Sequence, residues 1–345
     1  MMEVSLHVLL WNGERDLPDL VHSLRALSYP NLHIRMIDNG SIDGSRAYIQ
    51  EHAPEWLVGC NTKNIGFAAG HNQLISLALH RWEGEDLSQK IVVVTNQDMI
   101  LDAECISKMV EAFERQNSCG AVQPKVLRAI RPATEHDERM LSDVIDTTGL
   151  VMNLWWRMED RGAGVRDEGQ FDEQQDIVGP GGAFAAYRAN ALVGAVENGQ
   201  YFDEDFFSYR EDCDLALRLV RRGYATMFAP RAKAWHYRGM FGVEKRNLFQ
   251  RLRDRRQQQS FRNAWSMRNQ LFFLVKHVPL QAWKSFPRIF FQEGGRVCYA
   301  LIFEPDTRKL LIRALLTLQK MRKKRKEIFK NTRISSDELC AYAKR

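Results

Sequence analysis

The 345-residue sequence lacks several features that define common protein classes. Its six cysteines are scattered without a CxxC pair, which argues against a zinc site or a disulfide framework and favours a reducing cytoplasm. No apolar stretch reaches the roughly 18 residues expected of a transmembrane helix. The amino terminus has no basic segment and no small-residue cleavage site, and its apolar run stops at Asn12, so no signal peptide is predicted. These absences predict a globular cytoplasmic protein.

The charge of the chain is distributed unevenly along the sequence. Residues 246–345 hold 24 Lys and Arg against 7 Asp and Glu, a net charge of +17, whereas residues 1–245 carry a net charge of −11. The basic section also contains apolar residues at helical spacing. This asymmetry predicts an acidic α/β region over residues 1–245 and a basic α-helical extension over residues 246–345.

Strand-like and helix-like segments alternate through the first half of the chain. Short apolar runs with strand character lie at Val4–Leu10, Leu32–Ile37, Val58–Cys60, Ile91–Thr95 and Ala121–Leu127. Amphipathic helical segments, such as Asp16–Leu27, separate them. The alternation predicts a Rossmann-like, mostly parallel sheet flanked by helices. Residues 128–176 are polar and irregular, and predict an elaborated loop with a short hairpin.

A carboxylate follows each of two predicted strands. Asp38 comes directly after Leu32–Ile37, and Asp98 closes the run VVVTNQD. Ligands of open α/β sheets bind at the carboxyl ends of the strands, so both residues are site candidates. Burying an unpaired carboxylate costs roughly several kcal/mol. We therefore expect Asp98 to be exposed at the strand end, paired with a cationic side chain, or bound to a cation.

Six short runs then follow one another in a characteristic order. They are IDNGSIDGS at 37–45, NIGFAAGHN at 64–72, VTNQDMIL at 94–101, GPGGAF at 179–184, FDEDFFSYREDCDLALRLVRRGY at 202–224 and AWHYRG at 234–239. Together they resemble the inverting family 2 glycosyltransferases with a GT-A fold, of the bacterial rhamnosyltransferase-like branch. The last hundred residues match this family much more loosely. The resemblance implies transfer of rhamnose or a similar sugar from a dTDP- or UDP-sugar donor to a saccharide or lipid-linked saccharide.

The resemblance also implies a divalent cation. Asn96-Gln97-Asp98 corresponds to the DxD motif of the family in an Asn-first form, with Asp98 as metal ligand and His236 as a further ligand. Mg²⁺ or Mn²⁺ suits such oxygen-rich sites and would neutralise charge on the leaving diphosphate. Asn96 carries no charge and is assigned a contact to the donor ribose or to the outer shell of the metal. The alternatives are a turn or N-cap role for Asp98 and simple packing for His236.

The same comparison assigns the donor nucleotide to residues near the first strands. Asp38 and Asn39 would contact the nucleotide, and Asn64 and Gly66 would shape a loop lying against it. An Asx-turn is the alternative for Asp38. A glycine-initiated helix packed on the sheet is the alternative for the loop.

Glu211 and Asp212 resemble the catalytic ED pair of the family, with Asp212 as the base that deprotonates the acceptor hydroxyl. The first turn of a helix keeps such a carboxylate ionised, while the charge of Glu211 opposes ionisation. Ordinary charges at a helix start are the alternative. Asp214 is expected to be structural and paired with Arg218 at i+4.

Two further pairs of residues are assigned near the substrates. Gly181 and Gly182 would let the backbone approach the acceptor and the diphosphate closely. Trp155 and Trp156 are candidates either for stacking on an acceptor sugar or for packing in the core.

The basic section predicts contact with an anionic membrane surface, because apolar stripes there alternate with Lys and Arg. This would place the protein peripherally on the inner face of the cell membrane. Packing of the basic helices on the acidic region, or between copies of the chain, is one alternative. Nucleic-acid binding is another, but no recognition motif supports it, so no nucleic-acid partner is expected.

Two other functions remain open at this stage. A sugar nucleotidyltransferase shares a related sheet but normally carries a glycine-rich phosphate loop after its first strand, where this chain has LLWNGERD. A non-catalytic binding protein on a transferase fold is the second, since Asn96 replaces a carboxylate.

Overall fold

The computed structural model describes residues 1–131, 140–174, 177–237 and 248–344, with side chains from 261 onward in the last segment. The predicted boundary at 245/246 lies outside these residues. The strands are β1 (Glu3–Leu10), β2 (Leu32–Asp38), β3 (Leu57–Cys60), β4 (Lys90–Asn96), β5 (Met99–Leu101), β6 (Cys119–Ile130), β7 (Met140–Thr147), β8 (Leu150–Met152), β9 (Met158–Asp160), β10 (Phe184–Arg188) and β11 (Ala225–His236). The α-helices are α1 (Leu17–Arg25), α2 (Ser45–His52), α3 (Phe67–Arg81), α4 (Cys105–Arg115), α5 (Ala189–Gly194), α6 (Glu211–Arg221), α7 (Leu248–His277), α8 (Phe286–Phe303), α9 (Pro305–Lys330) and α10 (Ser336–Ala341).

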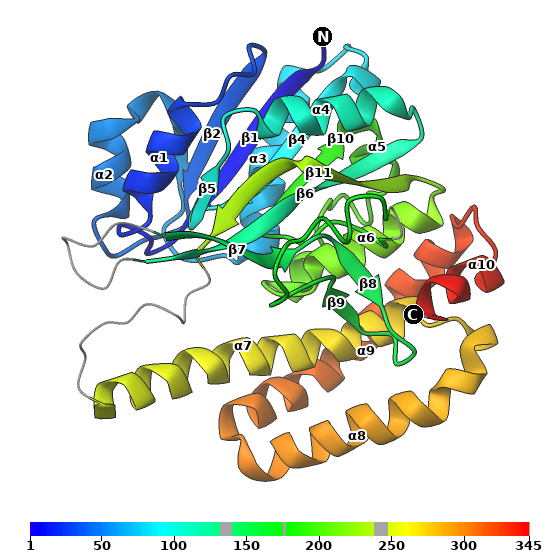
Figure 1. Ribbon diagram of the computed structural model, residues 1–345. Coiled ribbons are helices and arrows are strands. Elements are labelled where there is room, and N and C mark those ends of the chain that lie inside the picture. Colours follow the sequence, from blue (N-terminus) through cyan, green and yellow to red (C-terminus); the bar gives the residue numbers. More distant parts are fainter. Residues whose placement is uncertain (132–139, 175–176, 238–247, 345) are drawn as a thin grey trace.

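One large sheet forms the centre of the molecule (Figure 1). Its strand order is β3-β2-β1-β4-β10-β6-β11-β5, with β7 paired to β6. Strands β1 to β4 are mutually parallel, β11 is parallel to β6, and β10 runs antiparallel between β4 and β6. The central strand β4 is buried along Lys90–Thr95, as expected for a strand covered on both faces. The predicted mostly parallel sheet flanked by helices is confirmed.

Strand β11 is longer than the predicted strand, which ended at Phe228. The sequence analysis placed a turn at Pro230, but the strand continues to His236. Its pairing with β6 shifts register between Ala229 and Lys233. Proline fits a strand at such an irregularity because its missing N–H removes no regular ladder bond. The continuation carries His236 to the end of the sheet.

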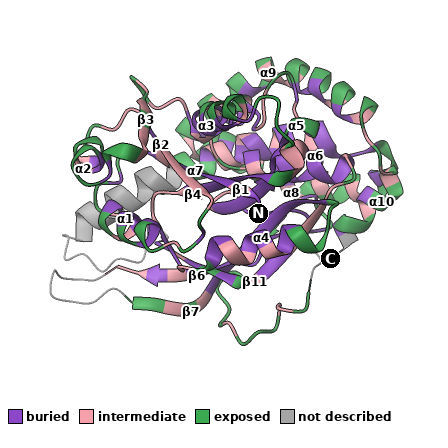
Figure 2. Cartoon of the chain, turned by 90° about the horizontal axis from the view of Figure 1, so that it is seen from above, coloured by how far each residue is buried: buried purple, intermediate pink, exposed green. Residues whose placement is uncertain are grey.

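Apolar side chains pack on both faces of the sheet, and Figure 2 shows the central strands as buried and the outer sides of the helices as exposed. Helices α1, α2 and α4 cover one face. Helices α3, α5 and α6 cover the other. A third apolar cluster joins the β8–β9 hairpin and α6 to the C-terminal helices α7, α9 and α10.

Helix α6 is buried on both sides because it lies between the sheet and the C-terminal helices. Leu215 and Leu219 pack toward the sheet, whereas Leu217 and Val220 pack toward the α7–α10 layer. A helix that is apolar on all sides is stable only when other elements surround it. The C-terminal section therefore completes the burial of α6. None of the helices in the described part of the chain combines the length and apolar character needed to cross a bilayer.

A buried ionic cluster joins the same two layers. The ammonium of Lys276, on α7, lies 2.8 Å from Glu197, 2.6 Å from Asp203 and 2.6 Å from Asp214. The imidazole of His277 lies 2.9 Å from the Asp214 carboxylate. Burial alone lowers the pKa of Lys276, but the charges of the three carboxylates outweigh it and raise the pKa. The lysine therefore stays charged in the protein interior.

We expect Lys276→Met to destabilise the protein strongly, since it leaves buried carboxylates without their main counter-charge. Removing one partner of a buried ion pair costs roughly 3–5 kcal/mol. Guanidinium denaturation followed by circular dichroism measures the change. Lys309→Met is the matched control, because Lys309 is exposed on α9 and should change stability by less than about 0.5 kcal/mol. Equal stability of the two variants would contradict the importance of the cluster.

Candidate functional site

The predicted site residues come from elements that meet at one edge of the sheet. Asp38 ends β2, Asn96 ends β4, and Asp98 lies in the short link to β5. His236 ends β11, and Asp212 lies in the first turn of α6. The polypeptide places them there because parallel strands end at a common edge.

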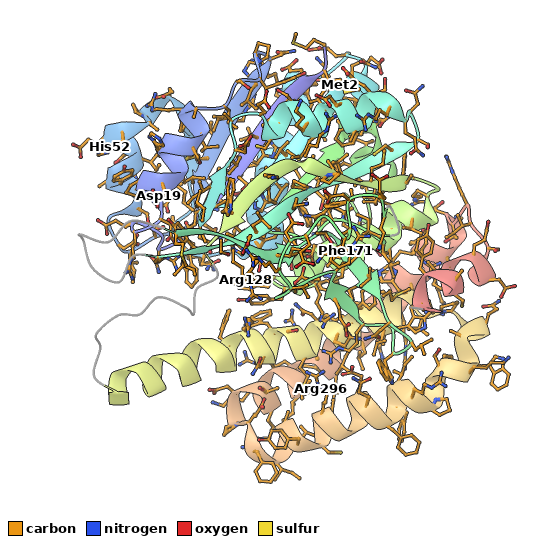
Figure 3. The ribbon with its side chains drawn as sticks, in the orientation of Figure 1. Met2, Asp19, His52, Arg128, Phe171 and Arg296 are labelled. Carbon is orange, nitrogen blue, oxygen red and sulfur yellow. The ribbon has the colours of Figure 1, made fainter. Side chains whose placement is uncertain are left out.

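Asp98 and His236 converge on one another. The Asp98 Oδ1 atom lies 3.2 Å from His236 Nε2, and the other ring nitrogen, Nδ1, lies 2.9 Å from Asp146 Oδ2 on β7. Arg128 on β6, labelled in Figure 3, approaches Asp146 at 3.8 Å. Asp98 is thus partly exposed at the strand end and paired with a histidine, as expected for a carboxylate that follows an apolar strand.

The charges of this group shift its titration. Burial lowers the pKa of His236, but the Asp98 charge and the hydrogen bond that the ring donates to Asp146 outweigh burial and raise the pKa to about 10. Burial raises the pKa of Asp98, and the His236 charge and hydrogen bond outweigh it, so the pKa is lowered. The donor set fits a divalent cation that replaces the proton between His236 Nε2 and Asp98, because a carboxylate and an imidazole nitrogen then face the ion while Asp146 orients the ring from behind.

The carboxylate of Asp212 faces the glycine loop before β10. Gly182 N–H donates to Asp212 Oδ2 at 2.8 Å, and Cys213 N–H donates to Oδ1 at 2.7 Å. A Cβ at Gly182 would lie 3.3 Å from the Asp212 side chain, so glycine allows this close approach. Gly181 N–H donates to Gln123 at 2.8 Å. The structure therefore brings Asp212 and the predicted loop together.

Glu211 differs sharply from its neighbour. Its side chain is buried, and its Oε2 atom finds no hydrogen-bond partner among the described residues. Burial, reinforced by the Asp212 charge, raises the pKa of Glu211 well above its ordinary value. Asp212 is partly exposed. Of the two carboxylates, Asp212 is the one that a substrate can reach.

The loop before α6 holds strained backbone. Phe207, Tyr209 and Arg210 all have positive φ angles, between 64° and 71°. Such conformations are costly for residues other than glycine, and they persist only where neighbouring groups hold them. Asn269 on α7 does so, since its Nδ2 group lies within hydrogen-bond distance of the carbonyls of residues 206, 208 and 209, at 2.8, 2.9 and 2.6 Å.

The predicted nucleotide loop is built by asparagines and one glycine. Asn39 Nδ2 donates to Asn64 Oδ1 at 3.0 Å, and Asn64 accepts from Gly66 N–H at 2.8 Å. Gly66 has φ +92°, and a Cβ there would lie 2.5 Å from the Phe207 carbonyl. This loop therefore packs directly on the strained segment before α6.

The remaining predicted residues have local contacts. Asp38 Oδ1 accepts from Ser41 N–H at 3.2 Å, a local contact to the residue three positions on and not the two-residue contact of an Asx-turn. Asn96 N–H donates to the Ala183 carbonyl at 2.9 Å, which ties the DxD segment to the glycine loop. Gln97 bonds the backbone of Trp11 in both directions, at 2.8 and 2.9 Å, and is structural.

The structure tests two further predictions, one for the tryptophans 155 and 156 and one for the Asp214–Arg218 pair. Trp156 is fully buried in the α6–α7 cluster, so it packs in the core and is not available to an acceptor, whereas Trp155 is 39% exposed. The predicted pairing of Asp214 with Arg218 is confirmed, at 2.9 Å.

Sequence reasoning missed Asp146 and Asn269. Asp146 lies in the irregular stretch 128–176, and Asn269 lies in a long helix of mixed composition. An acidic residue on the strand-like run MLSDVIDT is the one local signal that could have indicated Asp146.

A second acidic group could suggest another metal site. Glu197, Asp203 and Asp214 place carboxylate oxygens within 4.8 Å of one another. The ammonium of Lys276 already lies 2.6–2.8 Å from all three, and it takes the place that a cation would need. We therefore assign this group to structure and not to metal binding.

Comparison with known proteins gives consistent results. The family model Glycosyl transferase family 2 matches residues 5–193. N-acetylglucosaminyl-diphospho-decaprenol L-rhamnosyltransferase from Mycobacterium tuberculosis (strain ATCC 25618 / H37Rv) is 24% identical over 226 residues, which are 64% of this chain and 72% of that protein.

Two solved structures of low sequence identity match this chain over most of its length, and the first of them supports the fold. A crystal structure of S. aureus TarS has a TM-score of 0.50 at 12% identity, covering 96% of this chain and 83% of that chain. Mannosyltransferase PcManGT from Pyrobaculum calidifontis, in complex with GDP-Man and Mn²⁺, has a TM-score of 0.47 at 16% identity, covering 96% and 87%.

The motif order, the sheet, the Asp98–His236 pair and the hydrogen bond from the glycine loop to Asp212 thus agree with the family match. This agreement favours sugar transfer over nucleotidyl transfer and over a non-catalytic role. Because the matched residues make up more than half of the sequence, the chain belongs to glycosyl transferase family 2 and is a glycosyltransferase with a GT-A fold that uses a nucleotide sugar.

Proposed function

We propose that this glycosyltransferase moves rhamnose or a similar sugar from a dTDP- or UDP-sugar to a saccharide or lipid-linked saccharide, with inversion. The observation that carries the proposal is the Asp212 carboxylate, which is held by Gly182 N–H at the sheet edge where Asp98 and His236 meet. The M. tuberculosis relative is named as an L-rhamnosyltransferase of a decaprenol-diphosphate-linked N-acetylglucosamine, which supports this class of sugar and acceptor.

In the proposed step, the acceptor hydroxyl attacks the anomeric carbon while Asp212 takes its proton. The nucleoside diphosphate leaves from the opposite side of that carbon, so one displacement inverts the configuration. The two backbone N–H groups that bond the Asp212 oxygens fix the direction in which the carboxylate points. Fixed geometry of this kind lowers the entropic cost of bringing the base and the hydroxyl together.

Asp98 and His236 would hold Mg²⁺ or Mn²⁺, with Asp146 orienting the imidazole. When bound, the cation neutralises negative charge on the leaving diphosphate. Asn96 is proposed to contact the donor ribose or the outer shell of this ion.

The donor nucleotide is assigned to the loop formed by Asp38, Asn39, Asn64 and Gly66. Gly181 and Gly182 are assigned to the acceptor and diphosphate side. The chain would work on the inner face of the cell membrane, in contact with it through residues 246–345, and without a nucleic-acid partner.

The experiment is a donor panel. Purified protein is incubated with dTDP-rhamnose, UDP-sugars and GDP-mannose in Mn²⁺ or Mg²⁺, and nucleoside diphosphate release is measured with and without saccharide acceptors. NMR of the product gives the anomeric configuration, which we expect to be inverted. A retained configuration would contradict the role of Asp212, and turnover of GDP-mannose alone would contradict the donor class.

The support of the loop before α6 gives a further prediction. Asn269→Ala removes a donor that bonds three carbonyls of this loop, so the loop should relax and move Asp212. A displacement of about 1 Å at a catalytic group can cost about 100-fold in rate. We expect kcat to fall between about 10-fold and 100-fold.

Gln270→Ala is the matched control. Gln270 is the next residue, is equally buried, and donates to the Trp156 carbonyl at 3.1 Å instead of to the loop. Both variants should lose similar thermal stability, but Gln270→Ala should keep kcat within about threefold. Equal losses of kcat would show that Asn269 acts through general stability.

A further inference from the structure

Helix α8 turns large apolar side chains toward solvent, which is unusual for a surface helix. Its fully buried positions are Glu293 and Ala300, with Ile289 and Val297 partly buried. Its aromatic residues face solvent, with Phe290 73% and Phe291 77% exposed. Surface helices normally turn their apolar stripe toward the core. Packing inside this chain therefore does not account for the composition of α8.

The exposed apolar residues continue beyond α8 on both sides. Large apolar side chains that are at least half exposed lie at Leu280, Trp283, Phe290, Phe291, Tyr299, Ile302, Phe303, Ile312, Leu315 and Leu316. They come from the segment before α8, from α8 itself and from the first half of α9, and α8 packs against both neighbours. We call these residues the α8 face. Figure 1 shows α8 farther from the sheet than α7. Large apolar side chains that are exposed on adjoining segments are typical of an interaction site.

Basic residues surround the apolar side chains. The exposed cations of this part of the chain are Lys284, Arg288, Arg296, Arg308, Lys309 and Arg313, and Figure 3 labels Arg296. Of the acidic residues in this part, Glu293 is buried and Glu304 is partly buried, whereas Asp306 is exposed and lies 3.6 Å from Lys309. The six exposed cations therefore face one exposed carboxylate.

Three other lysines of the C-terminal section pair with carboxylates of the rest of the chain. Lys276 and Lys324 are buried against carboxylates, and Lys320 lies 2.7 Å from Asp205. Arg322, Lys323, Lys326 and Lys330 are also exposed, in the second half of α9, but no large apolar side chain among the described residues 317–341 is exposed beside them. Exposed cations and exposed large apolar side chains therefore occur together around α8 and the first half of α9.

We propose that the α8 face docks on the surface of an anionic lipid bilayer, with its aromatic and aliphatic side chains in the headgroup region and its Lys and Arg residues on lipid phosphates. The biological role of this docking rests on the proposed function, because a lipid-linked acceptor would be presented at the bilayer surface. Trp, Tyr and Phe beside Lys and Arg are the composition that binds the membrane interface.

The charge distribution favours a bilayer over a second copy of the chain. Pairing two α8 faces would bring the six cations of each copy close to those of the other. An anionic bilayer instead attracts every one of them. Association through this face also requires no membrane-spanning helix.

The test is co-sedimentation of the full-length protein with vesicles of phosphatidylcholine alone or mixed with phosphatidylglycerol. We expect at least roughly tenfold stronger binding to the anionic vesicles, with partial release at high salt because charge interactions are screened. Phe290→Ser combined with Phe291→Ser should weaken binding to anionic vesicles at least roughly tenfold. Arg288→Gln combined with Arg296→Gln should weaken it roughly tenfold without affecting neutral vesicles.

The control replaces exposed apolar residues elsewhere. Leu77 on α3 and Val193 on α5 are 46% and 44% exposed, and their double replacement by serine should leave vesicle binding unchanged. Equal loss of binding in this control and in the phenylalanine variant would overturn the assignment of the α8 face. Sedimentation velocity without lipid tests the alternative, and a dimer that the phenylalanine replacements dissociate, together with no vesicle binding, would also overturn it.

The result of the vesicle-binding test is independent of the result of the activity test. Asp212→Asn should bind vesicles like the wild type. The phenylalanine variant should hydrolyse donor in solution like the wild type. Vesicle binding without sugar transfer would support docking through the α8 face and contradict the proposed function. Sugar transfer without vesicle binding would support the proposed function and contradict docking through the α8 face.

Discussion

Asp212→Asn should retain the nucleotide-sugar donor and lose turnover. The amide has nearly the shape of the carboxylate and can still accept a backbone hydrogen bond, but it cannot take a proton. General-base catalysis contributes typically about 10²- to 10⁴-fold, and we expect kcat to fall within that range. Steady-state kinetics gives kcat, and isothermal titration calorimetry gives the affinity for the donor.

Glu211→Gln is the control that the structure offers. Burial raises the pKa of Glu211 well above its ordinary value and so favours the protonated form, which glutamine resembles closely in shape. This variant should keep kcat within about fivefold. The opposite result, a large loss for Glu211→Gln and a small one for Asp212→Asn, would move the base to Glu211.

Asp98→Ala should abolish Mn²⁺ binding and sugar transfer together while the protein remains folded. Asp98 lies in the link between β4 and β5 and is partly exposed, so its loss leaves no apolar cavity. Calorimetric titration with Mn²⁺ measures binding independently of activity. EDTA should inhibit the wild type reversibly, and full activity in EDTA would contradict the metal assignment.

Asp146→Asn extends the same test to the residue behind the imidazole. Loss of a carboxylate that orients a metal-binding histidine typically lowers metal affinity about 10- to 100-fold. Asp143→Asn is the matched control, since Asp143 is on the same strand but its side chain is 52% exposed and pairs with Arg166. Unchanged Mn²⁺ affinity in Asp146→Asn would remove Asp146 from the site.

The residues that sequence reasoning identified have one property in common. Asp38, Asn96 and Asp98 follow strands whose apolar pattern is visible in the sequence, and parallel strands bring their ends together. Asp212 lies at the start of a helix whose apolar periodicity is likewise visible in the sequence. For these positions, a local pattern was enough to predict the place in the fold.

The residues that were missed depend on contacts between distant segments. Asp146 meets His236 across 90 positions of sequence, and Asn269 meets the loop before α6 across 60 or more. Helical periodicity in α7 indicates which residues are buried but not which carbonyls they will bond. The burial of Trp156 could not be predicted from local sequence either, because it depends on packing against the C-terminal helices.

The ionic cluster around Lys276 has a consequence for the timing of folding during synthesis. Asp203 and Asp214 are made before Lys276, and at about 5–20 residues per second the delay after Asp214 is roughly 3–12 s. Throughout that interval α6 lacks both the cationic partner of Asp214 and the apolar layer that covers Leu217. A nascent chain that ended in this interval would expose the outer side of α6 to water and to other chains. The C-terminal helices must therefore be synthesised before α6 can reach its final packing.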